Sequence, residues 1–167
     1  VDGSGEPGFK ADHLLRDGTI IAVGEKLEAR VEHERDCGGK VLCPGFIVVH
    51  THDDALVLTN PEMLPKISQG VTTVVVGNCG ISLAPLTSKA PVAPLTLLCE
   101  SMYQFRSMAD YKAAIDKARP SLNVAALIGH SALRHEVLAD WRRPATEDER
   151  EQMQSLIREA MQAGAIG

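Results

Sequence analysis

The sequence predicts an α/β fold built around a parallel sheet. From residue 45 onward, short apolar runs alternate with segments that carry helix start and stop signals. The runs at 46–50, 71–77 and 122–130 are almost continuously hydrophobic, which is typical of strands in a parallel sheet with both faces covered. This alternation fits a doubly wound sheet or a (β/α) barrel, and periodicity alone does not choose between them.

The first 44 residues have a different character and predict a separate β-rich segment, so we expect a division into 1–44 and 45–167. Two apolar runs, Leu14–Leu15 and Thr19–Val23, flank an Asp-Gly pair at 17–18, which is a strong signal for a β-hairpin. The segment "CGGKVLCPG" predicts another short strand, closed by a Pro-Gly pair.

Helix signals follow in the second part of the chain. Residues 61–69 predict a helix that has Asn60 as its N-cap and Gly70 just past its end. The proline-rich residues 81–106 predict a long irregular connection, and a further helix is expected over 108–118. We therefore expect helices to link the strands of the sheet.

The last predicted helix begins after Thr146, with Glu149 three residues on, which is the spacing of a capping box. Ser107 is the expected N-cap of the preceding helix. After Gly164 the sequence becomes apolar again, as at the start of a fourth strand. Because the chain starts at Val1 rather than at methionine and stops as a strand begins, we expect it to be a segment of a longer protein.

The amino-acid composition narrows the classes to which this protein can belong. Hydrophobic residues make up 44% of the chain and charged residues 23%, as expected for a soluble globular protein. The net charge of −5 and the absence of a basic run argue against nucleic acid as a partner. No apolar run approaches the ~20 residues that span a bilayer, and no signal peptide is apparent. The chain has four cysteines, at residues Cys37, Cys43, Cys79 and Cys99. They lack paired spacing such as C-x-x-C, which favours a reduced, cytoplasmic chain.

The stretch "PGFIVVHTHDD" places two histidines at the end of an apolar run. His50 and His52 are two residues apart, so in a strand they project from one face with Cα atoms about 7 Å apart. Cys79 follows the next run, and parallel strands end at the same edge of a sheet. Separately, the histidines fit a polar loop and Cys79 an inert buried residue. Together they favour a zinc site, because zinc binds imidazole nitrogen and thiolate sulfur.

Three further polar residues lie near this expected site. Asp53 and Asp54 would either accept hydrogen bonds from the histidines or cap the next segment, and we favour capping. His130 closes the third apolar run and would share the same edge. Two interpretations of His130 are equally compatible with the sequence. It would contact the substrate or support the metal ligands, or it would be an ordinary hydrogen-bonded histidine.

These motifs resemble a known family. The segment "VLCPGFIVVHTHDD" resembles the first barrel strand of the metal-dependent amidohydrolase superfamily. The longer segment "PKISQGVTTVVVGNCGISLAPL" is similar to a narrower branch, the N-acyl-D-amino-acid deacylases, which include N-acyl-D-glutamate deacylase. The segments "VDGSGEPGFKADHLLRDGTIIAVGE" and "NVAALIGHSALR" also resemble that branch, so the resemblance covers essentially the whole chain.

The resemblance implies a (β/α)8 barrel of TIM type, of which residues 45–167 would supply three strands and the start of a fourth. Residues 1–44 would belong to a small β-sandwich. The implied reaction is zinc-dependent hydrolysis of N-acyl-D-amino acids to a D-amino acid and a carboxylate. His50 and His52 match a weaker metal position, and Cys79 matches a ligand of a tight zinc. In that family a zinc-activated water attacks the acyl carbonyl and an aspartate on a late strand moves the proton.

The sequence departs from the family pattern at Val48, where the superfamily usually has an aspartate ahead of H-x-H. Valine removes a polar partner on the face of His50 but deletes no ligand. The remaining zinc histidines and the catalytic aspartate would follow Gly167, so we expect no catalytic residue in this chain and no activity from it alone. Two alternatives stay open: a dihydropyrimidinase-like amidohydrolase acting on cyclic amides, and a short metal-binding module without catalysis.

Overall fold

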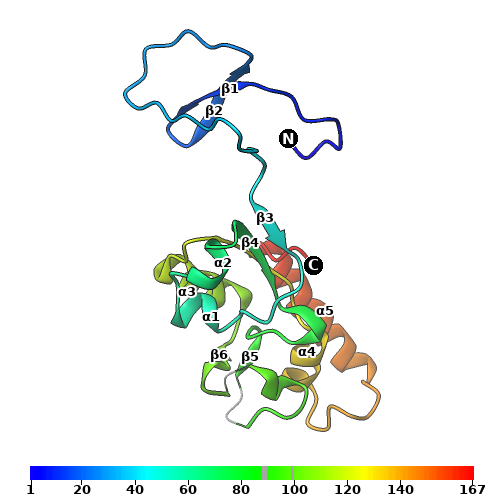
Figure 1. The fold of residues 1–167 in the computed structure, drawn as a ribbon. Helices are drawn as coiled ribbons and strands as arrows, with labels where there is room; N and C mark the ends of the chain where they lie inside the picture. Colours follow the sequence, from blue (N-terminus) through cyan, green and yellow to red (C-terminus); the bar gives the residue numbers. More distant parts are fainter. Residues whose placement is uncertain (88–89, 99) are drawn as a thin grey trace. The chain divides into compact units, whose positions relative to one another are not determined.

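The computed structural model describes residues 1–87, 90–98 and 100–167. Within these residues the chain forms two compact units, Val1–Pro44 and Gly45–Gly167, and Figure 1 labels most of their helices and strands. Cys99 and part of the irregular connection expected over 81–106 fall outside the described residues.

The first unit contains the predicted hairpin. Strand β1 (Asp12–Arg16) pairs antiparallel with β2 (Thr19–Gly24). The two turn residues both have left-handed backbones, Asp17 with φ 49° and Gly18 with φ 74°. Positive φ at both positions is the geometry that matches the twist of a two-residue hairpin and that an Asp-Gly pair adopts most readily. The hairpin prediction is therefore confirmed.

The short strand expected within "CGGKVLCPG" does not form. Val41 and Leu42 are 76% and 54% exposed, and no strand of the first unit pairs with them. The carbonyl of Leu42 instead accepts a hydrogen bond of 3.1 Å from the amino group of Val1. The prediction was wrong because a strand needs a hydrogen-bonded partner, and sequence character alone does not supply one.

The second unit is built on a parallel sheet of three strands in the order β3-β4-β7. The strands are β3 (Phe46–Val48), β4 (Val71–Val76) and β7 (Asn123–Ala126). The central strand β4 contributes the fully buried Val74 and Val76 to the core. Strand β3 lies at the edge, where Phe46 and Ile47 are 59% and 61% exposed. The parallel α/β sheet is confirmed, whereas the expected cover on both faces is missing at β3.

Two of the strands are shorter than predicted. Strand β3 ends at Val48 instead of residue 50, because the next β4 carbonyl, that of Val75, accepts side-chain hydrogen bonds. Strand β7 ends at Ala126 instead of residue 130, although its pairing extends through an N–H of Leu127 bonded to the Val76 carbonyl at 2.9 Å.

The last residues of the chain pair with this extension of β7, as expected for the start of another strand. The N–H of Ile166 donates to Ala126 at 2.9 Å, and the N–H of Ile128 donates to the carbonyl of Gly167 at 2.9 Å. Both segments run in the same direction along this contact. The sheet is thus extended on the side of β7, away from β3.

The helix expected over 61–69 forms only in part, as α2 (Leu64–Ile67), and a separate short helix, α1 (Leu56–Thr59), precedes it. Asn60 is the C-cap of α1, and the fully buried Met63 has a left-handed backbone with φ 48° immediately before α2. Burial of the Met63 side chain therefore breaks the helix that the local signals favour. Gly70 closes the segment as predicted, with φ 80°.

The three longer helices are α3 (Met108–Ala118), α4 (His130–Val137) and α5 (Glu147–Gln162). Ser107 and Thr146 each form the expected N-cap of α3 and α5, and both make a complete capping box. Helix α1 packs against α3, and α4 packs against α5. No helix among the described residues is both long and apolar enough to cross a membrane.

Short elements connect β4 to α3. They are the 3₁₀ turn Asn78–Gly80, strand β5 (Leu86–Thr87), the 3₁₀ turns Leu95–Leu97 and Glu100–Met102, and strand β6 (Gln104–Phe105). Strands β5 and β6 pair antiparallel. These elements contribute to one continuous core, whose largest fully buried apolar and aromatic side chains are Tyr111, Met63, Leu83, Leu86, Leu95, Val57, Val74 and Val76.

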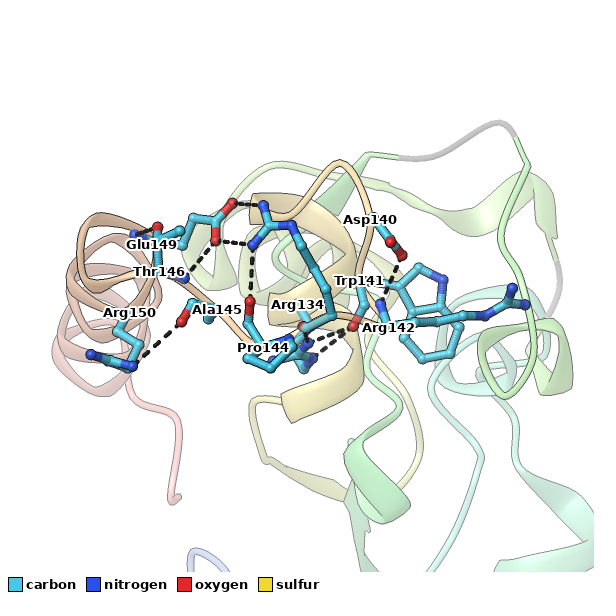
Figure 2. A network of polar contacts seen from close by, with 10 residues as sticks. Arg134, Asp140, Trp141, Arg142, Pro144, Ala145, Thr146, Glu149 and Arg150 are labelled. Atoms are coloured by element: carbon cyan, nitrogen blue, oxygen red, sulfur yellow. Dashed lines mark hydrogen bonds and ion pairs between the residues drawn. The ribbon is translucent and has the colours of Figure 1, made fainter.

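An arginine network fixes the loop between α4 and α5 (Figure 2). Arg134 of α4 donates through Nε to the carbonyl of Trp141 at 3.0 Å and through Nη2 to the carbonyls of Trp141 and Arg143. Arg143 in turn makes a bidentate contact with Glu149, with N–O distances of 2.8 and 2.5 Å. The loop backbone is thus held from α4 and from the first turn of α5.

Replacing Glu149 with glutamine should lower the melting temperature at neutral pH. The Arg143 guanidinium, followed by the Thr146 N–H, lowers the pKa of Glu149 from 4.5 to about 2. A carboxyl whose pKa is lowered by folding stabilises the fold at pH values above its unfolded-state pKa. This contribution disappears as the pH falls from about 4.5 toward 2. Thermal denaturation at several pH values should show the parent and variant curves converging in acid. The exposed Glu151 on the same helix, changed to glutamine, is the control, and a constant difference across pH would contradict the prediction.

Candidate metal centre

Three potential ligands converge where β3 and β4 end. One ligand atom each from His50, His52 and Cys79 lies within 4.8 Å of the others. His50 Nε2 lies 3.0 Å from Cys79 Sγ, within hydrogen-bond distance. The two imidazole rings are 5.6 Å apart between centroids and inclined by 73°. The structure therefore brings together the three side chains that the sequence selected as a metal site.

The thiol is presented by an unusual backbone turn. Cys79 has φ 57° and ψ 21°, a left-handed conformation that costs an L-residue about 1–2 kcal/mol. Gly77 and Gly80 on either side have φ of 83° and 75°. At Gly77 a Cβ atom would lie 2.2 Å from the carbonyl oxygen of Leu127, so only glycine fits there. The tight turn lets the chain reverse directly after β4 with Sγ facing the histidines.

This donor set fits a zinc ion. Tetrahedral zinc places nitrogen and sulfur ligands at about 2.0–2.3 Å, so its ligand atoms lie roughly 3.3–3.8 Å apart. The separations here, within 4.8 Å, need only small side-chain adjustments. His52 Nδ1 is buried and has no hydrogen-bond partner among the described residues, which is unfavourable unless this ring binds something further. Two imidazoles and one thiol are ligands that zinc accepts readily.

The aspartates after the histidines do not cap the next helix. Helix α1 has Ala55 as its N-cap and no side-chain cap, so the capping role favoured from the sequence was wrong. Asp53 instead forms an ion pair of 2.8 Å with Lys66. Its backbone carbonyl, rather than its side chain, accepts from the N–H of Val57 at 3.0 Å. The ion pair turns the Asp53 carboxylate toward α2.

Asp54 is fully buried, which the sequence did not indicate. Burial raises the pKa of its carboxyl to about 7, and the backbone N–H of Gly77 opposes this effect in part. Neither carboxyl oxygen makes a well-formed hydrogen bond with the described residues. The Asp54 carbonyl accepts from the hydroxyl of Tyr111 at 2.7 Å, and burial raises the pKa of that hydroxyl. Asp54 thus anchors the histidine segment to α3 through its backbone.

His130 is not part of the converging group. It is exposed and opens α4, whereas the sequence placed it at the end of a strand. Strand β7 ends at Ala126, and Gly129 is the N-cap of α4. A Cβ atom at Gly129 would lie 2.4 Å from the carbonyl oxygen of Gly80, so α4 starts close beside the turn that carries Cys79.

Val48, where the sequence departs from the pattern of the family that it resembles, is half-buried and packs against the core. Two polar residues that the sequence reasoning missed lie next to the candidate ligands in the sequence. The hydroxyl of Thr51 donates to the carbonyl of Val75 at 2.8 Å, and the amide of Asn78 donates to the same carbonyl at 2.8 Å. Their adjacency to His50, His52 and Cys79 in the sequence is a signal that could have identified them.

Comparisons with known proteins place this chain in a family. A family model described as "Amidohydrolase family" matches residues 33–167. The D-aminoacylase of Alcaligenes xylosoxydans xylosoxydans is 49% identical over all of this chain, which covers 35% of that protein.

Two solved structures are also similar. A D-aminoacylase, studied for the functional role of its binuclear metal centre, is 50% identical with a TM-score of 0.95. The N-acyl-D-glutamate deacylase of Bordetella bronchiseptica, complexed with zinc and a phosphonate mimic of the tetrahedral intermediate, is 44% identical with a TM-score of 0.91. In both cases the match covers 99% of this chain and 35% of the solved chain. This chain therefore spans about a third of the length of its relatives, and it belongs to the amidohydrolase family.

Proposed function

We propose that the protein carrying this chain is a zinc-dependent hydrolase of N-acyl-D-amino acids, which releases a D-amino acid and a carboxylate. The observation that carries the proposal is the convergence of a thiol with two imidazoles at the ends of adjacent parallel strands. The similarity to D-aminoacylase and to N-acyl-D-glutamate deacylase extends over almost the whole chain and supports the substrate class.

The proposed architecture is a (β/α)8 barrel whose first strands are β3, β4 and β7. Their parallel order and the pairing of residues 165–167 beyond β7 are consistent with such a barrel. Residues 1–44 would belong to a small β-sandwich. In a barrel of this type, sites form at the carboxyl ends of the strands, which is where the three candidate ligands lie.

Within the site, Cys79 would hold a tight zinc ion, and His50 and His52 would form a weaker metal position. Bound zinc would bring the pKa of a water molecule near neutrality and polarise the acyl carbonyl. Asp53, paired with Lys66, would fix the course of the chain just after His52. His130, exposed at the start of α4, is a candidate contact for the substrate. The residue that moves the proton would not come from this chain.

We also propose that the enzyme works in the cytoplasm on a small-molecule substrate, without nucleic acid or membrane as a partner. Cys37, Cys43 and Cys79 are free thiols among the described residues. A zinc-binding thiolate must stay reduced, which a reducing compartment ensures.

Stereospecific hydrolysis tests the proposed function. The whole gene product, purified with its metal, should release acetate from N-acetyl-D-amino acids and leave the L-enantiomers almost untouched. Dihydrouracil, a cyclic amide, is the second probe in the same assay. Hydrolysis of dihydrouracil alone would replace the proposal with a cyclic amidohydrolase, and bound zinc with no hydrolysis of any probe would indicate a metal-binding protein without catalysis.

A further inference from the structure

We propose that Thr51 and Asn78 are positioning residues that set the distance between the histidine pair and the thiol. The inference rests on the proposed zinc site and adds residues that do not themselves offer a ligand atom to the cluster. Thr51 lies between His50 and His52, and Asn78 directly precedes Cys79. Each positioning residue is therefore covalently adjacent to the ligands that it would place.

The two side chains share one acceptor. The Thr51 hydroxyl and the Asn78 amide both donate to the carbonyl oxygen of Val75, each at 2.8 Å. The Asn78 amide also donates to the carbonyl of Thr51 at 3.3 Å. A carbonyl oxygen has two lone pairs and an amide NH₂ has two hydrogens, so this closed set uses the capacity of both groups.

These bonds take the place of strand pairing. The backbone ladder between β3 and β4 stops at the pair Val48 and Val74, just before the segment that carries the histidines. Beyond that point, Thr51 and Asn78 provide hydrogen bonds that connect the histidine segment to the end of β4. Thr51 is only 5% exposed, so water does not compete freely for its hydroxyl.

The cysteine turn depends on this connection. Cys79 keeps its left-handed backbone only if the surrounding structure holds it there. The Asn78 amide ties the first residue of that turn to β4 and to the histidine segment at the same time. Loss of either polar side chain should therefore let the thiol and the imidazoles move relative to each other, and zinc binding should weaken.

Matched substitutions in the whole protein test the inference. Thr51→Val removes the hydroxyl and keeps the branched shape, whereas Thr51→Ser keeps the hydroxyl. Asn78→Ala removes the shared amide, and Asn123→Ala removes a similar amide bond of 3.0 Å to another β4 carbonyl, that of Thr72, in an exposed position. The probes are zinc affinity measured by chelator competition and the thiolate-to-metal absorption of the cobalt-substituted protein.

We expect Thr51→Val and Asn78→Ala to bind zinc about 10–100-fold more weakly, as is usual when groups that orient metal ligands are removed. Thr51→Ser and Asn123→Ala should keep the parent affinity. The cobalt absorption should change only in the first two variants. If Asn78→Ala does not fold, the nearly isosteric Thr51→Val still decides. Parent-like zinc affinity in a folded Thr51→Val would overturn the inference.

Cys79→Ala, measured in parallel, separates this inference from the proposed function. If Cys79→Ala loses zinc while Thr51→Val keeps it, only the positioning role fails. If Cys79→Ala binds zinc like the parent, the proposed zinc site itself fails.

Discussion

Replacing Cys79 with alanine should weaken zinc binding by more than about 100-fold, beyond the usual effect of changing a group that only orients a ligand. The variant loses the sulfur ligand of the proposed tight zinc position and leaves the two imidazoles, one of them exposed, of the proposed weaker position. Zinc content after gel filtration, measured by mass spectrometry, should fall toward zero, and hydrolytic activity should fall with it.

Cys43→Ala is the matched control for this experiment. Cys43 is also a free, exposed thiol among the described residues, but it lies in the Val1–Pro44 unit and no imidazole is grouped with it. Its replacement should leave the zinc content unchanged. Equal zinc loss in both variants would mean that Cys79 has no special part in the site.

Replacing Gly77 with alanine should destabilise the fold by about 2–5 kcal/mol. Alanine at φ 83° costs about 1–2 kcal/mol. The added Cβ would lie 2.2 Å from the carbonyl oxygen of Leu127, a backbone atom, and relieving such a contact costs about 1–3 kcal/mol more. Chemical denaturation of the parent and the variant measures the difference in the free energy of unfolding.

Gly70→Ala isolates the contribution of the clash. Gly70 has nearly the same φ, 80°, but its added Cβ would meet only two Phe46 side-chain carbons, at 3.4 and 3.5 Å, which are ordinary contacts. Gly70→Ala should lower the free energy of unfolding by about 1–2 kcal/mol, which is the cost of the left-handed backbone alone. If the two variants were equally destabilised, the close approach of Leu127 would not be what requires glycine at residue 77.

Local signals predicted the parts of the fold that local interactions determine. The hairpin turn and the N-caps Ser107 and Thr146 form as expected, because each depends on hydrogen bonds or backbone angles within a few residues. The helix over 61–69 is shortened to Leu64–Ile67 because the Met63 side chain is buried in the core, which no local signal reports. Tertiary packing overrode propensity at that point.

The candidate site was predicted only as far as residue chemistry allowed. His50, His52 and Cys79 were selected from the sequence because their types and their places after apolar runs are unusual. The burial of the Asp54 carboxyl depends on contacts with distant segments. One of these is a hydrogen bond to the Asp54 carbonyl from Tyr111, 57 residues later in the sequence. The sequence contained these residues but not the folded neighbours that give them their environment.

The early end of β3 also explains how two histidines so near in sequence can face one point. In a continued strand, side chains two residues apart stand side by side at about 7 Å, roughly parallel. Here the backbone leaves the pleat after Val48, and the rings of His50 and His52 approach to 5.6 Å and turn by 73°. Because the segment after Val48 is not held in the regular alternation of a strand, the two imidazoles can point in the different directions that tetrahedral coordination of an ion requires.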